Sequence, residues 1–180
     1  GTKTLKDAVN ETMREWARRK DDTHYIIGSA LGPAPYPDMV REFQRVIGDE
    51  VRAQIKEYGE KQPDVLIACA GGGSNLGGLM SAFMQDKLTG KANPHFIAVE
   101  PSACPSFTRG KYAYDYCDVG RITPLAKMYT LGSDFIPASI HAGGLRYHGM
   151  SPTLSKLYHD GYIDEARAVG QKDVFDAAVL

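Results

Sequence analysis

The sequence predicts an α/β fold with a parallel sheet, and two apolar segments joined by a helix support that prediction. Residues 65–69 form a continuous apolar run, and residues 95–99 form a similar one, as is typical of strands buried in a parallel sheet. Between them, residues 75–88 repeat apolar side chains at helical spacing. A strand, a short glycine turn, a helix and a second strand make one βαβ unit, whose crossover should be right-handed.

The N-terminal third should hold two helices and one short strand. Apolar residues at three- and four-residue steps predict an amphipathic helix over residues 4–20. Residues 24–28 are a strand candidate, followed by a proline-rich loop. We expect one helix over about 38–58. Its buried stripe would be Val40, Phe43, Ile47, Val51 and Ile55.

The C-terminal part shows a weaker pattern followed by clearer elements. Between residues 101 and 152 the periodicity fades, yet so long a structureless segment is unusual in a compact domain, so short strands should lie there. A helix is expected at about 153–160 and a strand at 166–169. A final helix should begin near Asp173.

Composition excludes several classes of protein. The 180 residues include 43% hydrophobic and 24% charged residues, as in ordinary globular domains. A net charge of -1 provides no basic field for nucleic acid, and no apolar run reaches the ~18 residues of a membrane span. Three cysteines are too few for a disulfide scaffold, so reduced thiols and a cytoplasmic location are expected. The histidines and cysteines have no metal-ligand spacing, so no metal site is predicted.

The strongest local motif is the glycine cup, which consists of Gly71, Gly72, Gly73, Ser74 and Asn75 between a predicted strand and helix. Glycines let the backbone approach a ligand, and a helix N-terminus adds partial positive charge. A P-loop would need Gly-Lys-Ser/Thr, and both the dinucleotide fingerprint and the serine-nucleophile elbow would need glycine where Leu76 stands. From the motif by itself, a phosphate site and a structural turn with Ser74 as the helix N-cap both remain open.

Several segments closely resemble the tryptophan synthase β chain family, in the order and spacing found there. They are GTKTLKDA (1–8), GSALGP (28–33), YPDMVREFQ (36–44), CAGGGSN (69–75) and VEP (99–101). The segment HAGGLRYHG (141–149) resembles the second, less common type of that chain. GGGSN is shared with other fold-type II pyridoxal-phosphate enzymes, whereas the combination with REFQ and LRYHG is more specific.

The resemblance implies a fold and an activity. The fold would be that of a fold-type II pyridoxal-phosphate enzyme, with a twisted parallel sheet and helices on both faces. Residues 1–43 would be the tail of the N-terminal cofactor domain, including the end of a mobile closing domain. Residues 44–180 would be the front part of the C-terminal cofactor domain. The parent enzyme would be a lyase that uses pyridoxal 5'-phosphate to join indole and L-serine into L-tryptophan.

The resemblance also implies roles for single residues. The cup residues Gly71, Gly72, Gly73, Ser74 and Asn75 would hold the cofactor phosphate. Cys69 would lie beside the cofactor, and Ser29 would lie near its ring, where the family usually has threonine. Gly144 and Arg146 would belong to the substrate and closure segment.

Two departures from the family pattern affect the expected partners and activity. Arg146 stands where the usual type has an aspartate, so the closing contacts should differ from those of the usual type, and partnership with a tryptophan synthase α subunit stays open. Lys6 matches a lysine that faces that α subunit in the usual type. The family's Schiff-base lysine and catalytic glutamate precede residue 1, so no catalytic residue is assigned here and the isolated chain is expected to be inactive. A homodimer is expected, because it would cover the apolar stripe of the last helix.

Two other functions compete with this interpretation. One is a non-catalytic phosphate-binding α/β module that is complete as it stands. The other is a different pyridoxal-phosphate lyase directed at serine or threonine, such as a deaminase. The REFQ helix and the LRYHG segment argue against the second alternative.

Overall fold

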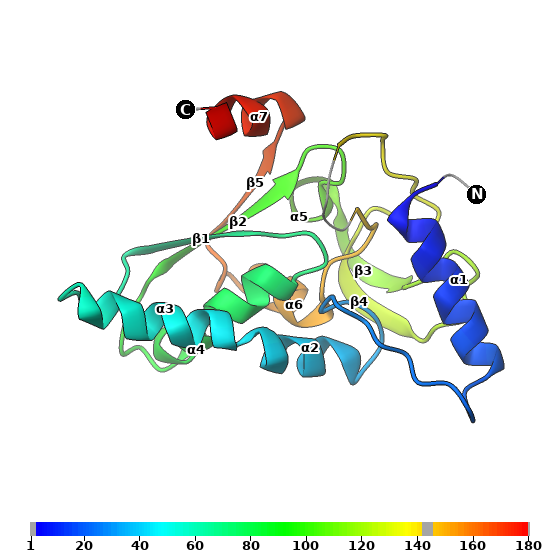
Figure 1. The fold of residues 1–180 in the computed structure, drawn as a ribbon, viewed down its shortest axis with the longest axis horizontal. Coiled ribbons are helices and arrows are strands. Elements are labelled where there is room, and N and C mark those ends of the chain that lie inside the picture. The colour runs from blue at the N-terminus through cyan, green and yellow to red at the C-terminus, as the bar shows by residue number, and fades with distance from the viewer. Residues whose placement is uncertain (1–2, 142–145, 180) are drawn as a thin grey trace.

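A three-stranded parallel sheet forms the centre of the computed structural model, which describes residues 3–141 and 146–179. The strands β1 (Val65–Cys69), β2 (His95–Pro101) and β5 (Glu165–Val169) lie in the order β1-β2-β5 (Figure 1). The helix α4 (Ser74–Leu88) connects β1 to β2. The predicted βαβ unit is therefore confirmed, and the α/β fold with it.

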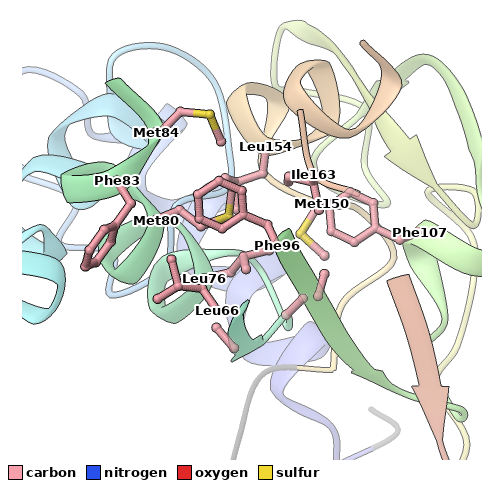
Figure 2. Close-up of a cluster of buried hydrophobic side chains, with 13 residues drawn as sticks. Leu66, Leu76, Met80, Phe83, Met84, Phe96, Phe107, Met150, Leu154 and Ile163 are labelled. Atoms are coloured by element: carbon pink, nitrogen blue, oxygen red, sulfur yellow. The ribbon is translucent and has the colours of Figure 1, made fainter. Parts of the chain in front are cut away.

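One face of this sheet carries the main core. Leu66, Phe96 and Ala98 point into a cluster closed by α4 and by α6 (Pro152–His159). Figure 2 shows side chains from these elements meeting around Phe96. The buried members are Leu66, Ala68, Ala70, Leu76, Met80, Phe83, Met84, Phe96, Ala98, Phe107, Met150, Leu154 and Ile163.

The other face of β1 is open. Val65 and Ile67 point away from the core and are 49% and 60% exposed. Full burial of this strand, which its unbroken apolar run favours, is therefore wrong: β1 is buried on one face, as its alternating burial shows.

The helix predicted over 38–58 is two helices, α2 (Tyr36–Gln44) and α3 (Val46–Glu57), which meet at Arg45. The buried face of α2 is formed by Tyr36, Pro37 and Val40. Phe43 lies off that face and is 72% exposed, so its assignment to the buried stripe is wrong. Val51 and Ile55 of α3 do pack against the main core.

A second packing unit surrounds the antiparallel hairpin of β3 (Lys111–Tyr116) and β4 (Leu125–Thr130). These are the short strands expected between residues 101 and 152, and a short helix, α5 (Ser106–Arg109), precedes them. The N-terminal helix α1 (Leu5–Arg18) lies against this unit (Figure 1). The shared buried cluster comprises Met13, Tyr25, Leu31, Tyr36, Cys117, Met128 and Tyr147.

Residues 24–28 are not a strand, and this prediction is wrong. The segment finds no strand to pair with among the described residues. Instead, Tyr25 places its ring 5.8 Å from that of Trp16 and 5.5 Å from that of Tyr36, measured between centroids. Aromatic packing, rather than a hydrogen-bonded ladder, fixes this part of the chain.

The chain ends in α7 (Gln171–Val179), which follows β5 directly. The helix begins two residues before the expected position. Its apolar residues Val174, Phe175 and Val179 are exposed, so the expected apolar stripe exists, and of these Phe175 lies beside His141, with 5.9 Å between the ring centroids. Among the described helices, none has the length and apolar character needed to cross a membrane.

Glycines allow α4 to pack at very short range against both α2 and α3. A Cβ on Gly48 would lie 2.5 Å from the carbonyl oxygen of Leu79. A Cβ on Gly78 would lie 2.4 Å from the carbonyl oxygen of Gln44. Because these neighbours are backbone atoms, they cannot turn aside, and the helices would have to separate.

We therefore expect Gly78→Ala to lower the free energy of unfolding by about 1–3 kcal/mol, through overpacking. Gly77→Ala is the matched control in the same helix, since the nearest atoms to its Cβ would be 3.7 Å away. This control should be neutral or stabilising by roughly 0.5–1 kcal/mol, because alanine loses less entropy than glycine in a helix. Urea unfolding of the full-length protein measures both changes. Equal effects of the two substitutions would contradict the close crossing.

Candidate functional site

The glycine cup forms the turn between β1 and α4, as the sequence predicts. Gly73 is the N-cap of α4 and has a φ of +115°, a left-handed conformation that favours glycine. Ser74 is the first residue of the helix, so its alternative role as the N-cap is wrong. The amides from Gly71 to Leu76 donate to no acceptor among the described residues. The cup thus presents a run of donors at a helix N-terminus, where an anion is favoured.

The side chain of Asn75 fixes the shape of the cup. Its Oδ1 accepts a hydrogen bond from the backbone amide of Cys69, at 3.2 Å. This bond joins the last residue of β1 to the first turn of α4, so the side-chain oxygen of Asn75 serves the shape of the turn. The thiol of Cys69 belongs to an exposed residue on the wall of the cavity described below.

The back of the cup rests on α6. The amide of Ser151, the N-cap of α6, donates to the carbonyl oxygen of Gly72 at 3.0 Å. A Cβ on Gly73 would lie 2.7 Å from Leu154 Cδ1 and 2.9 Å from Ser151 Cβ. Glycine is therefore required at position 73 for two reasons: the positive φ and the close approach of the chain to α6.

The front of the cup opens into a cavity of about 920 Å³. This volume is at the upper end of ordinary small-molecule sites, about 300–1,000 Å³. Its walls come from α1, residues 25–31, the ends of β1 and β2, the segment around Arg146, and α7. The lining residues that the sequence also singled out are Ser29, Cys69, Gly71, Gly72, Gly73, Ser74, Asn75 and Arg146. The assignment of Gly144 lies outside the described residues.

The charges around this cavity are few. Arg146 is the one arginine or lysine among its described lining residues, and its Nη1 donates to the carbonyl oxygen of Ala138 at 2.8 Å. Glu100 also lines the cavity, but its carboxylate accepts the amides of Phe107 and Thr108, each at 2.8 Å. Glu100 thus caps α5 and is not placed as a general base. The described walls suit an anion and an apolar ring, and they present no lysine nucleophile.

Other lining residues were missed by sequence reasoning. His141, Gln171 and Phe175 reach the cavity from the segment before Arg146 and from α7. The amide of His141 donates to Gln171 Oε1 at 2.9 Å, which joins these two walls. His141 begins the segment HAGGLRYHG and Phe175 belongs to the expected apolar stripe, but neither signal indicates their proximity, which results from the return of β5 to the sheet beside β2.

Lys6 occupies a place that the sequence did not indicate. Its side chain is buried, with 4% of the residue exposed, and Nζ donates to the carbonyl oxygens of Ser133, at 2.6 Å, and Phe135. It therefore faces the interior of this chain. Burial lowers the pKa of Lys6 despite the nearby carboxylate of Asp134.

His148 lies fully buried two residues after Arg146. Its Nε2 is 2.8 Å from the carbonyl oxygen of Tyr116, and its Nδ1 has no partner among the described residues. Burial lowers the pKa of His148 to about 4, because the charged imidazolium would lose its hydration. The ring is therefore neutral at pH 7.

Comparison with known proteins gives consistent matches. The family model described as pyridoxal-phosphate dependent enzyme matches residues 2–180. The chain is 52% identical over 172 residues to the tryptophan synthase beta chain 2 of Methanosarcina mazei, covering 96% of this chain and 37% of that relative. It is 49% identical over 177 residues to the tryptophan synthase beta chain of Fervidobacterium nodosum, covering 98% and 40%.

The solved structures agree on the fold. A crystal structure of a threonine deaminase from T.th. superposes with a TM-score of 0.54 at 23% identity, covering 81% of this chain and 40% of that one. At that identity the likeness concerns the fold alone. The chain spans about two fifths of the length of these relatives.

The buried state of His148 predicts an acid-sensitive fold. The pKa is about 4 when folded and about 6.5 when unfolded, so the unfolded chain binds more protons between these values. Stability should be unaffected above pH 6.5 and fall by up to about 3 kcal/mol as the pH drops to 4. Urea unfolding from pH 4 to 7 measures the slope. His148→Gln should flatten it, whereas His24→Gln, at an exposed position, should not; an unchanged slope in His148→Gln would refute this origin.

Proposed function

We propose that this chain, which belongs to the pyridoxal-phosphate dependent enzyme family, supplies the phosphate-binding part of the cofactor site in an enzyme that joins indole to L-serine. The product would be L-tryptophan, formed with loss of water. The identity of about 50% to tryptophan synthase beta chains supports this reaction. The observation that carries the proposal is the run of amides, Gly71 to Leu76, that find no acceptor in the described part of the chain and lie at the edge of a large cavity.

The cup residues fit a phosphate group. Their amides and the N-terminus of α4 would hold the anion without a basic side chain. Asn75 would keep the turn in shape through its bond to Cys69. Bound there, pyridoxal phosphate supplies an electron sink for bonds at the amino acid's α-carbon.

The rest of the cavity fits the cofactor ring and the substrates. Ser29 and Cys69 line the same cavity as the cup. Indole would meet apolar groups of α1 and of the following loop, among them Val9 and Ile27. No lysine lies among the described lining residues, so the amine that bonds the cofactor is not assigned to them.

We also propose the division and partners that the resemblance implies. Residues 1–43 would belong to the N-terminal cofactor domain and residues 44–180 to the C-terminal one. Gly144 and Arg146 would act in substrate closure. A homodimer is supported by the exposed apolar residues of α7, while the inward position of Lys6 counts against a standard α subunit contact. The cytoplasmic location stays a prediction.

The cup can be tested with two glycines at opposite ends of α4. Gly73→Ala combines an unfavourable φ with contacts shorter than 3 Å, so the cup must shift. Gly90→Ala is the control, because Gly90 also has a positive φ, +69°, but open space around it. In the full-length protein, Gly73→Ala should weaken pyridoxal phosphate binding by about tenfold or more, equal to about 1.4 kcal/mol, and Gly90→Ala by less than about twofold.

Absorbance titration with pyridoxal phosphate measures the affinity, and product analysis measures the reaction. Tryptophan should form from indole and serine. Keto acid from serine or threonine, without tryptophan, would favour the deaminase alternative. Equal cofactor affinity in Gly73→Ala and the unsubstituted protein would overturn the cup assignment, and binding with no turnover of any of these substrates would favour the non-catalytic module.

A further inference from the structure

We propose that Lys6 is a positioning residue that clasps two walls of the cavity together, α1 and the segment 131–141 that follows β4. The role of this clasp in substrate binding rests on the proposed function. The clasp itself is a property of the chain and can be tested without turnover.

The contact at Lys6 joins residues that are distant in sequence. Its ammonium donates to the carbonyl oxygens of Ser133 and Phe135, 127 and 129 positions further along the chain. A buried ammonium must have such partners, since an unsatisfied charge is costly. These two hydrogen bonds therefore fix the distance between α1 and the segment 131–141.

One side of the clasp is the N-terminal half of α1. Leu5, Ala8, Val9 and Thr12 of this helix line the cavity. The C-terminal half has anchors of its own, because Met13 is buried in the second cluster and Trp16 packs against it. In the N-terminal half, Asn10 Oδ1 accepts from the amide of Val119 at 3.1 Å, whereas the Lys6 hydrogen bonds join the first turn to the segment 131–141.

The other side of the clasp is the segment 131–141, which also reaches the cavity. Ile140 and His141 line the cavity at the end of the segment 131–141. The carbonyl oxygen of Ala138 accepts from Arg146, and the amide of Leu131 donates to the carbonyl oxygen of His148 at 2.8 Å. A shift at Ser133 would thus move groups that line the cavity, including Arg146.

The cup itself does not depend on this contact. It is held by Asn75, by Ser151 and by the packing of Gly73 on Leu154. Loss of the clasp should therefore leave cofactor binding intact and change substrate binding. That separation of effects distinguishes a positioning role from a general loss of stability.

The substitution Lys6→Met tests the clasp, with Lys20→Met, at an exposed position beyond α1, as the control. In the full-length protein, we expect Lys6→Met to raise the KM for substrates about tenfold, with pyridoxal phosphate affinity changed less than about twofold. Hydrogen exchange followed by mass spectrometry should quicken in peptides 5–12 and 131–141 together. Exchange in peptide 65–88, which holds the cup, should stay as it is.

A further measurement follows how hydrogen exchange responds to serine. Serine added to the cofactor-loaded protein should slow exchange in both wall peptides in parallel, and Lys6→Arg should keep this coupling because it retains a charged donor. Quickening of peptide 5–12 without 131–141, or slowing of one wall without the other, would overturn the clasp. Coupled exchange in a protein that makes no tryptophan would uphold the clasp and refute the proposed function.

Discussion

The approach of Gly73 to α6 is the constraint on which the site depends. No Cβ can stand between this residue and Leu154, and its φ of +115° is one that glycine adopts readily. The turn after β1 can therefore fold against the core rather than outward. Its amides have no acceptor among residues 3–141 and 146–179 at the point where α4 begins, so close packing behind the turn leaves donors in front of it that can bind an anion.

The cavity lies where two packing units meet. The sheet with α4 and α6 is held by a large apolar core, while α1 and the hairpin share a smaller aromatic cluster. The cup belongs to the first unit, and the wall formed by α1 belongs to the second. Sites between such units can be rigid on one side and adjustable on the other, because relative motion of packed units costs less than repacking either core. Lys6 lies at the adjustable side.

Few charged side chains line the described walls of this cavity. The carboxylate of Glu100 accepts hydrogen bonds from the amides of Phe107 and Thr108, and the ammonium of Lys6 donates to two backbone carbonyls. Arg146 remains as the one guanidinium on the described walls. The anionic part of a ligand would therefore be attracted to two places in the cavity, the cup amides and Arg146.

Sequence by itself determined the parts governed by local chemistry. The βαβ unit followed from apolar runs of strand and helix length, and the glycine cup followed from a motif whose residues are contiguous. The resemblance to tryptophan synthase β chains also followed from contiguous segments. The tertiary structure decided the rest: Tyr25 joins an aromatic cluster instead of a strand, Phe43 faces solvent, and Lys6 faces inward. These outcomes depend on which distant segments supply a neighbour, and neither residue type nor spacing contains that information.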